Sequence, residues 1–274
     1  MTRLLSGGVL LVLVGLAAWW APPAGILAVV LLFVVIGAAE YAALSTALGA
    51  RCAPLAVAIA AAIVCAAVSW PALGHFAGPV AGDAAVPAIM AITIAFGLVG
   101  IARGQISGDS LARVASPVFG ALYLGLPLGA IVAVRALAGR EAMILLVVAI
   151  VISDTAQFYT GRLLGRRPLA PALSPKKTIE GALGGLVIGS AATAAIAGWW
   201  WPPTPIGVRL AAGAALVVLG ICGDLFESMV KRAAGVKDSG TLIPGHGGVL
   251  DRIDALLFAA PVYYAFVRYV FQPS

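Results

Sequence analysis

Long apolar stretches alternate with short polar segments along the whole chain. A helix that crosses a bilayer needs about 20 mostly apolar residues, and nine stretches of roughly that length can be marked out. They lie near residues 4–20, 24–42, 52–70, 86–102, 113–137, 142–160, 181–200, 206–223 and 250–271. The pattern therefore predicts an all-α polytopic integral membrane protein with about nine transmembrane helices.

Two of these stretches leave an alternative open. Pro117 and Pro127 interrupt the fifth one, and because proline removes a helical hydrogen bond they can divide this span into two short helices. The first stretch, with Arg3 ahead of its apolar run, also has the form of a signal peptide. Trp19 and Trp20 suit an interfacial anchor and a second span follows at once, so we expect a retained span.

Composition supports a membrane location. Hydrophobic residues make up 62% of the chain and charged residues 10%, whereas a soluble domain has about 25% charged residues. The net charge is +6, but the basic residues form short clusters between apolar runs, which argues against a nucleic-acid partner. Cys52, Cys65 and Cys222 lie in or beside apolar stretches without the spacing of a metal site, and we interpret them as packing residues.

The basic residues indicate the orientation. With a cytoplasmic N-terminus and nine spans, 13 of the 17 Lys and Arg residues fall on the cytoplasmic side, as the positive-inside rule requires. The two segments richest in basic residues, 161–178 and 224–254, then both face the cytoplasm. We therefore expect a multi-pass protein of the cell inner (plasma) membrane, in contact with membrane lipids, whose active site lies on the cytoplasmic face.

Acidic residues are concentrated in the second half of the chain. Four of the 11 precede residue 150. The other seven are Asp154, Glu180, Asp224, Glu227, Asp238, Asp251 and Asp254. We therefore expect residues 1–141 to form an N-terminal transmembrane scaffold and residues 142–274 to form a catalytic transmembrane half with cytoplasmic loops.

Two polar features flank the connection between the sixth and seventh spans. Asp154 sits in an apolar stretch without an adjacent basic residue. Such a carboxylate normally faces a polar cavity and is a functional candidate, although it can also be a structural hydrogen-bonding residue near a helix end. Lys176 and Lys177 follow a Ser-Pro turn. Lysines at this border commonly mark topology or contact headgroups, and they can also bind phosphate.

A third stretch carries a denser set of polar side chains. One helix face is expected to carry four of them at i, i+3, i+4 and i+7: Asp224, Glu227, Ser228 and Lys231. Asp251 and Asp254, three residues apart, share a face of the next helix. The loop 237–248 between these helices includes Gly247 and Gly248, and glycines allow backbone N–H groups to approach an anion closely.

A mixed set of carboxylates, lysines and glycines is typical of phosphoryl or nucleotidyl transfer. Carboxylates hold Mg²⁺, which bridges phosphate oxygens, and basic residues neutralise the charge on a leaving pyrophosphate. A solvated loop with surface salt bridges also explains the charges, but it does not explain carboxylates at both helix ends. His246 is an isolated histidine between two glycines, so a zinc site is not expected.

The same stretch resembles a known family signature. It contains Ser-Met-Val-Lys-Arg at 228–232, Lys-Asp at 237–238, Pro-Gly-His-Gly-Gly at 244–248 and Asp-Arg-Ile-Asp at 251–254. This run is similar to the signature of phosphatidate cytidylyltransferases, also called CDP-diacylglycerol synthases. The segment 174–181 and the Asp154 helix also resemble that family, with small departures at Ile179 and at 157–159. The resemblance is concentrated in residues 150–254.

The resemblance implies an integral enzyme that transfers the cytidylyl group of CTP to phosphatidic acid by metal-assisted in-line nucleotidyl transfer, giving CDP-diacylglycerol and pyrophosphate. It implies Mg²⁺ as the cofactor, with room for a second cation. Asp224 and Asp251 would be the metal ligands, and a homodimer is one form of assembly that the resemblance implies. The residues that it assigns to catalysis are Asp154, Lys177, Asp224, Ser228, Lys231, Asp251 and Asp254. Those that it assigns to substrate binding are Lys176, Arg232, Lys237, Asp238, His246, Gly247, Gly248 and Arg252.

Three other classes share some of these features. A secondary transporter would place polar residues near the midplane of two related halves, whereas here they gather at one face of one half. A CDP-alcohol phosphotransferase has a carboxylate motif that begins with Asp-Gly. Gly247 and Asp251 match part of that motif, but its first half is missing here. A CTP-using membrane lipid kinase lacks the segment from Lys-Asp to His-Gly-Gly. The sequence therefore favours the nucleotidyl transferase.

Overall fold

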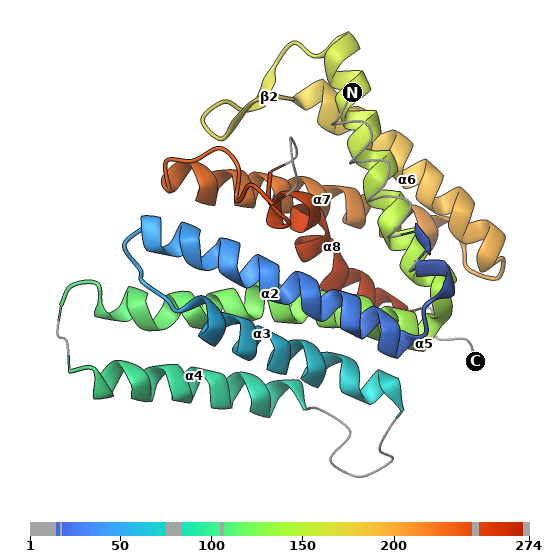
Figure 1. Ribbon diagram of the computed structural model, residues 1–274. Coiled ribbons are helices and arrows are strands. Elements are labelled where there is room, and N and C mark those ends of the chain that lie inside the picture. Colours follow the sequence, from blue (N-terminus) through green and yellow to red (C-terminus); the bar gives the residue numbers. More distant parts are fainter. Residues whose placement is uncertain (1–14, 17, 75–83, 105–106, 243–246, 271–274) are drawn as a thin grey trace.

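Helices joined by short loops make up most of the protein (Figure 1). The computed structural model describes residues 15–16, 18–74, 84–104, 107–242 and 247–270. The helices are α2 (Pro23–Ala47), α3 (Pro54–Ser69), α4 (Ala85–Ala102), α5 (Ser110–Leu164), α6 (Ile179–Trp200), α7 (Ile206–Ala233) and α8 (Leu250–Tyr269). A 3-10 turn, η1 (Trp70–Leu73), extends α3, and two short strands, β1 (Pro168–Ala170) and β2 (Ser174–Thr178), precede α6.

Six helices of this described part are long and apolar enough to cross a membrane: α2, α3 with η1, α4, α5, α6 and α7. Helix α8 has 20 residues but carries Asp251, Arg252 and Asp254 near its start. The chain thus has the architecture of a polytopic, almost entirely helical membrane protein. The predicted span at 4–20 falls largely outside the described residues, and the count of nine and the cytoplasmic N-terminus stay predictions.

Helix α5 combines the fifth and sixth predicted spans in 55 residues with one sharp bend. The bend lies at Gly139, whose φ of 82° and ψ of −175° are open to glycine and strained for other residues. Pro117 and Pro127 are buried inside the first part of the helix, so the division of this span at its prolines does not occur. Proline costs a membrane helix one hydrogen bond, which neighbouring helices can compensate, whereas positive φ requires glycine.

Helix α5 is also the centre of the packing, because it contacts every other helix from α2 to α8. Two glycines bring it close to α3. A Cβ atom on Gly125 would lie 2.6 Å from the carbonyl oxygen of Ala61, and one on Gly129 would lie 2.7 Å from that of Cys65. Small residues at crossings are the usual means of close helix packing in membranes, where the hydrophobic effect does not drive helices together.

The helices fall into two groups in space (Figure 1). Helices α2, α3, α4 and the first part of α5 lie side by side, whereas the second part of α5 and α6 lean away from them and carry the β-hairpin at their end. Helices α7 and α8 pack against each other, and α7 also contacts α6. The polar ends of α5, α6, α7 and α8 consequently meet around one region.

The segment 161–178, predicted to be a loop, contains the antiparallel pair β1 and β2. The Glu180 carboxylate closes the hairpin base by accepting hydrogen bonds from the backbone N–H groups of Arg166 and Arg167 at 3.0 and 3.2 Å. The side chain of Thr178 caps the start of α6. Strands this short, with prolines and lysines and no alternation of apolar residues, leave no pattern by which sequence can identify them.

Candidate active site

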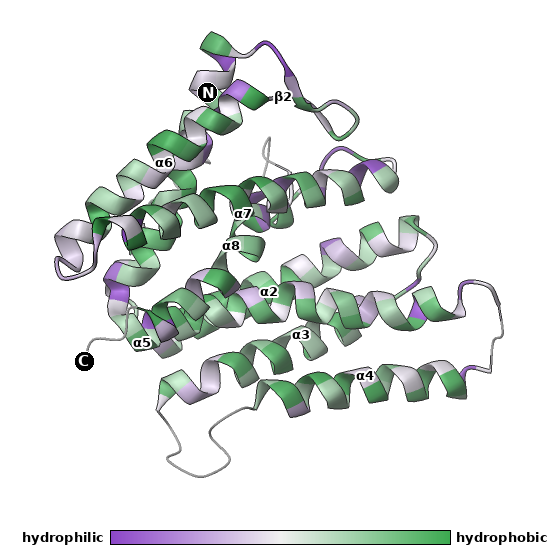
Figure 2. Cartoon of the chain, turned by 180° about the vertical axis from the view of Figure 1, so that it is seen from behind, coloured by the Kyte–Doolittle hydropathy of each residue, from purple (hydrophilic) through white to green (hydrophobic). Residues whose placement is uncertain are grey.

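Hydrophilic residues occur at the hairpin and at the end of α7, whereas most of the length of the helices is hydrophobic (Figure 2). In the structure, residues from the three polar stretches described above lie together. Lys177 on β2, Asp154 on α5 and Asp224 on α7 line one pocket of about 390 Å³. This pocket therefore forms from parts of the chain separated by up to 70 residues.

Apolar and basic groups share this pocket. Phe158, Leu169 and Ala182 line it together with Arg162 and Lys176. Phe158 is 59% exposed, so it contributes an open apolar surface beside the charged groups. A pocket with this mixed lining suits a substrate that has both an anionic group and an apolar part.

Asp224 is held by groups from two elements. Its carboxylate forms an ion pair with the Lys177 ammonium from the hairpin and accepts a long hydrogen bond of 3.4 Å from the Ser228 hydroxyl one helical turn further along α7. Asp154 lies close enough to Lys177 and Asp224 to interact with both electrostatically, and it accepts a 3.1 Å hydrogen bond from the amide of Gln157. The hairpin lysine thus lies between two carboxylates.

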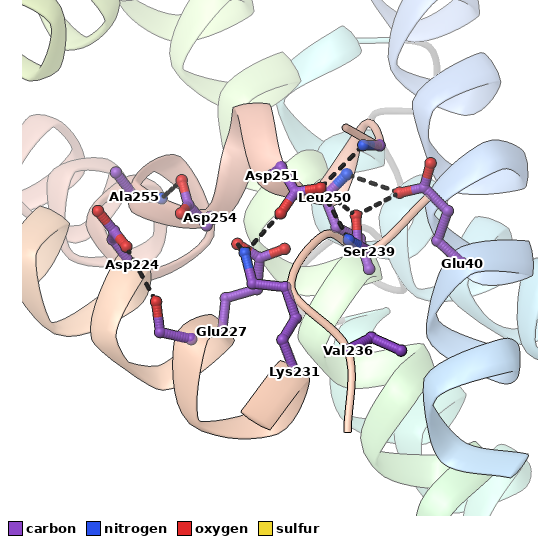
Figure 3. Close-up of polar contacts among 12 residues, drawn as sticks. Glu40, Asp224, Glu227, Lys231, Val236, Ser239, Leu250, Asp251, Asp254 and Ala255 are labelled. Carbon is purple, nitrogen blue, oxygen red and sulfur yellow. Dashed lines mark hydrogen bonds and ion pairs between the residues drawn. The ribbon is translucent and has the colours of Figure 1, made fainter. Parts of the chain in front are cut away.

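A second lysine is buried between two other carboxylates (Figure 3). The Lys231 ammonium lies 3.1 Å from Glu227 Oε2 on its own helix and 2.5 Å from Asp251 Oδ1 on α8. Lys231 is 8% exposed and Glu227 is 2% exposed. Because a buried charge is costly without its partner, this triad joins the end of α7 to the start of α8.

Asp251 also fixes the glycine-rich loop. Its Oδ2 accepts three hydrogen bonds of 2.8 Å, from the backbone N–H and the hydroxyl of Ser239 and from the backbone N–H of Gly248. Gly247 beside it has a φ of 79°, a left-handed conformation that glycine adopts readily. Both oxygens of Asp251 are therefore engaged within the protein.

Glu40 is a site residue that sequence reasoning missed. It belongs to α2, in the part predicted to be scaffold, and is 8% exposed. Its carboxylate accepts hydrogen bonds from the backbone N–H groups of Val249 and Leu250 at 2.9 and 2.8 Å and from the Ser239 hydroxyl at 3.1 Å (Figure 3). The signal was available, because an acidic residue inside an apolar span is a functional candidate by default.

These contacts also show which anions the end of the glycine-rich loop holds in this structure. The N–H groups of Gly248, Val249 and Leu250 donate to the carboxylates of Asp251 and Glu40, so the anions that this part of the loop holds belong to the protein itself. The N-terminus of α8 carries a partial positive charge, which a buried carboxylate compensates. The substrate-binding role expected for Gly247 and Gly248 stays a prediction.

Some predicted residues lie at the edge of the site. Arg232, Lys237 and Asp238 are exposed at the end of α7 and the loop after it, and Arg232 donates a 3.2 Å hydrogen bond to the Val236 carbonyl. Arg252 is exposed on α8 and Lys176 is exposed at the pocket. His246 lies outside the described residues.

The arrangement of the carboxylates is relevant to the predicted Mg²⁺. Among the described residues no three His, Cys, Asp or Glu side chains form a ready-made metal cluster. Asp224 and Asp251, the two predicted ligands, each pair with a lysine ammonium instead. Glu227 Oε1 is buried without a hydrogen-bond partner in this part of the chain, so it can accept Lys231 if that lysine leaves Asp251.

The donor set therefore fits a hard divalent cation. It consists of carboxylate oxygens, and Mg²⁺ commonly takes one or two carboxylates together with water and phosphate oxygens. Both predicted ligands already face a positive charge in the structure, so a cation can replace the ammonium groups without leaving unpaired carboxylates. Asp254 lies beside Glu227 and shares a side-chain hydrogen bond with it. A hydrogen bond between two carboxyl groups requires that one of them keeps its proton, so this pair does not add two full negative charges to the site.

Comparison with known proteins supplies independent information. A family model described as the cytidylyltransferase family matches residues 1–270. The phosphatidate cytidylyltransferase of Synechocystis is 48% identical over 117 residues, which are 42% of this chain and 39% of that protein. The phosphatidate cytidylyltransferase of Haemophilus influenzae is 45% identical over 123 residues, which are 43% of this chain and 42% of that protein.

A relative without an assigned function also matches. The uncharacterized protein YnbB of Escherichia coli is 44% identical over 132 residues, which are 48% of this chain and 44% of that protein. The chain thus spans less than half the length of each of these three relatives.

Proposed function

The chain belongs to the cytidylyltransferase family, and from this premise we propose that it transfers the cytidylyl group of CTP to phosphatidic acid. An oxygen of the lipid phosphate attacks the α-phosphorus of CTP, a new phosphorus–oxygen bond forms, and the bond to the β-phosphate breaks. The products are CDP-diacylglycerol and pyrophosphate. The observation that supports this proposal most is the pocket in which Lys177 faces Asp154 and Asp224 beside an apolar wall.

The lysines neutralise the phosphates in this proposal. Lys177 and Lys231 now pair with Asp224 and Asp251. When the triphosphate binds, its oxygens offer each ammonium a new partner of higher charge, and Lys231 keeps Glu227 as a second partner on its own helix. Positive charge held near the β- and γ-phosphates stabilises the leaving pyrophosphate as its bond to the α-phosphorus breaks.

We propose Mg²⁺ as the cofactor, with Asp224 and Asp251 as the ligands that would hold it and room for a second cation beside Asp254. The cation would polarise the phosphate oxygens and reduce the repulsion between the two anionic substrates. Ser228 acts by orienting the Asp224 carboxylate, which it contacts, and no covalent intermediate on this hydroxyl is required.

The lipid substrate reaches the pocket from the membrane side. Phe158, Tyr159 and Leu163 are 59%, 58% and 78% exposed at the end of α5. Apolar side chains of a membrane helix at this position suit acyl chains, and Arg162 and Lys176 at the same pocket suit the lipid phosphate. We propose that the pocket opens to the cytoplasmic face of the inner membrane, where CTP is available, and that a homodimer is the functional assembly.

A labelling experiment tests the reaction. Purified protein receives phosphatidic acid, Mg²⁺ and CTP labelled either at the α-phosphorus or at the γ-phosphorus. We expect the α-label in the lipid product and an equal amount of pyrophosphate. Lipid that carries the γ-label instead would identify a kinase, and CDP-diacylglycerol consumed in the presence of an alcohol would identify a phosphotransferase. Either result would overturn the proposal, and the Asp224→Asn variant serves as the inactive control.

A further inference from the structure

A second and larger pocket lies between α3, α4 and α5. It has a volume of about 630 Å³ and shares no lining residue with the pocket beside Lys177. Its lining residues belong to the end of α4, the start of α5, and the start of α3 with the residues just before it, and these helix ends lie on one side of the molecule in Figure 1. Glu40 near the end of α2 contacts the start of α8, so the connection from α2 to α3 is on the same face of the protein as the candidate active site.

Three arginines lie at this pocket: Arg51, Arg103 and Arg113. Arg113 forms a 2.8 Å ion pair with Asp109, and hydrogen bonds from Ser107 and Arg113 hold the pKa of the exposed Asp109 below its ordinary value. The charge at the pocket is therefore +3 from the arginines and −1 from Asp109. The excess of positive charge favours an anion.

Arg51 and Arg103 differ from the arginines at the opposite helix ends. At that end Arg135 and Arg209 donate to backbone carbonyls and Arg140 pairs with Glu141. Arg51 and Arg103 are exposed and form no hydrogen bond or ion pair with the described residues. The positive-inside rule accounts for arginines on this face, but it does not account for two of them at the mouth of one apolar pocket.

The walls of this pocket are apolar. Phe96, Val99 and Ile101 on α4 face Leu111 and Val114 on α5 across it. Ile92 is the one buried residue of α4, and Ile101 and Leu111 are 77% and 79% exposed. Contact with hydrocarbon is favourable for such an apolar surface, and a hydrophilic anion alone would leave most of the pocket without a matching partner.

We propose that this pocket binds an anionic phospholipid, with its phosphate among Arg51, Arg103 and Arg113 and its acyl chains along α4 and α5. Each guanidinium matches phosphate oxygens in charge and in the geometry of its donors. The two helices that form the pocket are held close together at Gly100 on α4, where a Cβ atom would lie 2.7 Å from the side chain of Val114 on α5. The proposal does not depend on the reaction at the other pocket.

Native mass spectrometry of the detergent-solubilised protein tests this site with phosphatidylglycerol, an anionic phosphodiester lipid that is not a substrate in the proposed reaction. We expect phosphatidylglycerol to be retained in preference to phosphatidylcholine. Replacing one basic residue near an anionic headgroup weakens binding roughly fivefold, so the double variant Arg51→Gln/Arg103→Gln should weaken it about 25-fold. Arg140→Gln, which removes a charge from the opposite helix ends, is the control and should change nothing.

Two further measurements make the outcome decisive. The thermal unfolding midpoint of the double variant should equal that of the parent, because both arginines are exposed and unpaired in the described part of the chain. Excess inorganic phosphate should not displace the lipid, since the acyl chains contribute to binding. Equal retention of phosphatidylglycerol by parent and double variant, equal retention of phosphatidylcholine, or displacement by phosphate would each overturn the proposal.

Discussion

The carboxylate of Glu40 on α2 accepts a 2.8 Å hydrogen bond from the backbone N–H of Leu250 at the start of α8, 210 positions later in the chain. With the companion bonds from Val249 and the Ser239 hydroxyl, it fixes the helix that carries Asp251. The first half of the chain thus takes a direct part in shaping the candidate active site.

We expect Glu40→Gln to lower activity by up to about 100-fold, because the amide has one acceptor oxygen where the carboxylate has two, and a displaced Asp251 spoils the geometry of transfer. An unsatisfied buried donor should also cost about 1–3 kcal/mol of folding stability. Labelled CTP incorporation and thermal unfolding measure the two effects. Glu141→Gln, at the opposite helix ends, is the control, and equal activity in the two variants would contradict this role for Glu40.

Gly248→Ala should abolish most activity. A Cβ atom there would lie 2.3 Å from the Ser239 hydroxyl oxygen and 2.5 Å from the Glu40 carboxyl carbon, so the loop or the carboxylate must move. Gly207→Ala is the matched control, because a Cβ atom on Gly207 meets nothing within 4 Å. We expect that variant to be as stable as the parent or slightly more so. Normal CTP incorporation by Gly248→Ala would show that the loop tolerates displacement.

The two paired lysines should differ in what their removal does. Lys231→Ala leaves Glu227 and Asp251 buried without their countercharge, so we expect a loss of about 3–5 kcal/mol in folding stability together with activity. Lys177 is more exposed, and Lys177→Ala should cost less than about 1 kcal/mol while still abolishing most transfer. Chemical denaturation compared with CTP incorporation separates the two patterns. Similar losses of stability in both variants would contradict this distinction.

Asp224→Asn and Asp251→Asn should each lower the rate roughly 100-fold or more, on the scale of removing one electrostatic contact to the transition state. Both should also raise the Mg²⁺ concentration needed for half-maximal activity, because each removes a negative ligand. The measurement is a Mg²⁺ titration of CTP incorporation. Substantial activity with an unchanged Mg²⁺ requirement in both variants would show that the cation is held elsewhere.

Cysteine labelling in intact cells tests the orientation, in a parent protein from which Cys52, Cys65 and Cys222 have been removed. A cysteine at Pro203, in the short connection between α6 and α7, should react with an impermeant reagent from outside. A cysteine introduced at Leu173, between β1 and β2, should react only after the cytoplasmic side has been opened. Labelling of the hairpin in intact cells would contradict the orientation and with it the access of cytoplasmic CTP.

Local properties of the chain were sufficient to predict most of the helices. The predicted spans near 24–42, 86–102 and 181–200 lie within a few residues of α2, α4 and α6, because hydropathy and length are summed over neighbouring residues. The i, i+3, i+4, i+7 spacing from Asp224 to Lys231 likewise placed these side chains on one face, because a helix repeats about every 3.6 residues. The motif at 228–254 indicated the family without any knowledge of the fold.

The tertiary structure decided which charged groups meet. Sequence placed Asp224 and Asp251 at neighbouring helix ends. It could not show that Asp224 pairs with Lys177 from the hairpin, whereas Asp251 pairs with Lys231 from α7. It gave Glu40 no role, since that role depends on how α2 packs beside α8. Helix packing is set by the shape of many side chains at once, including close approaches at Gly125 and Gly129. Local pattern therefore determined where the helices run and which residues are candidates for the chemistry, and only packing determined which of these charged groups meet.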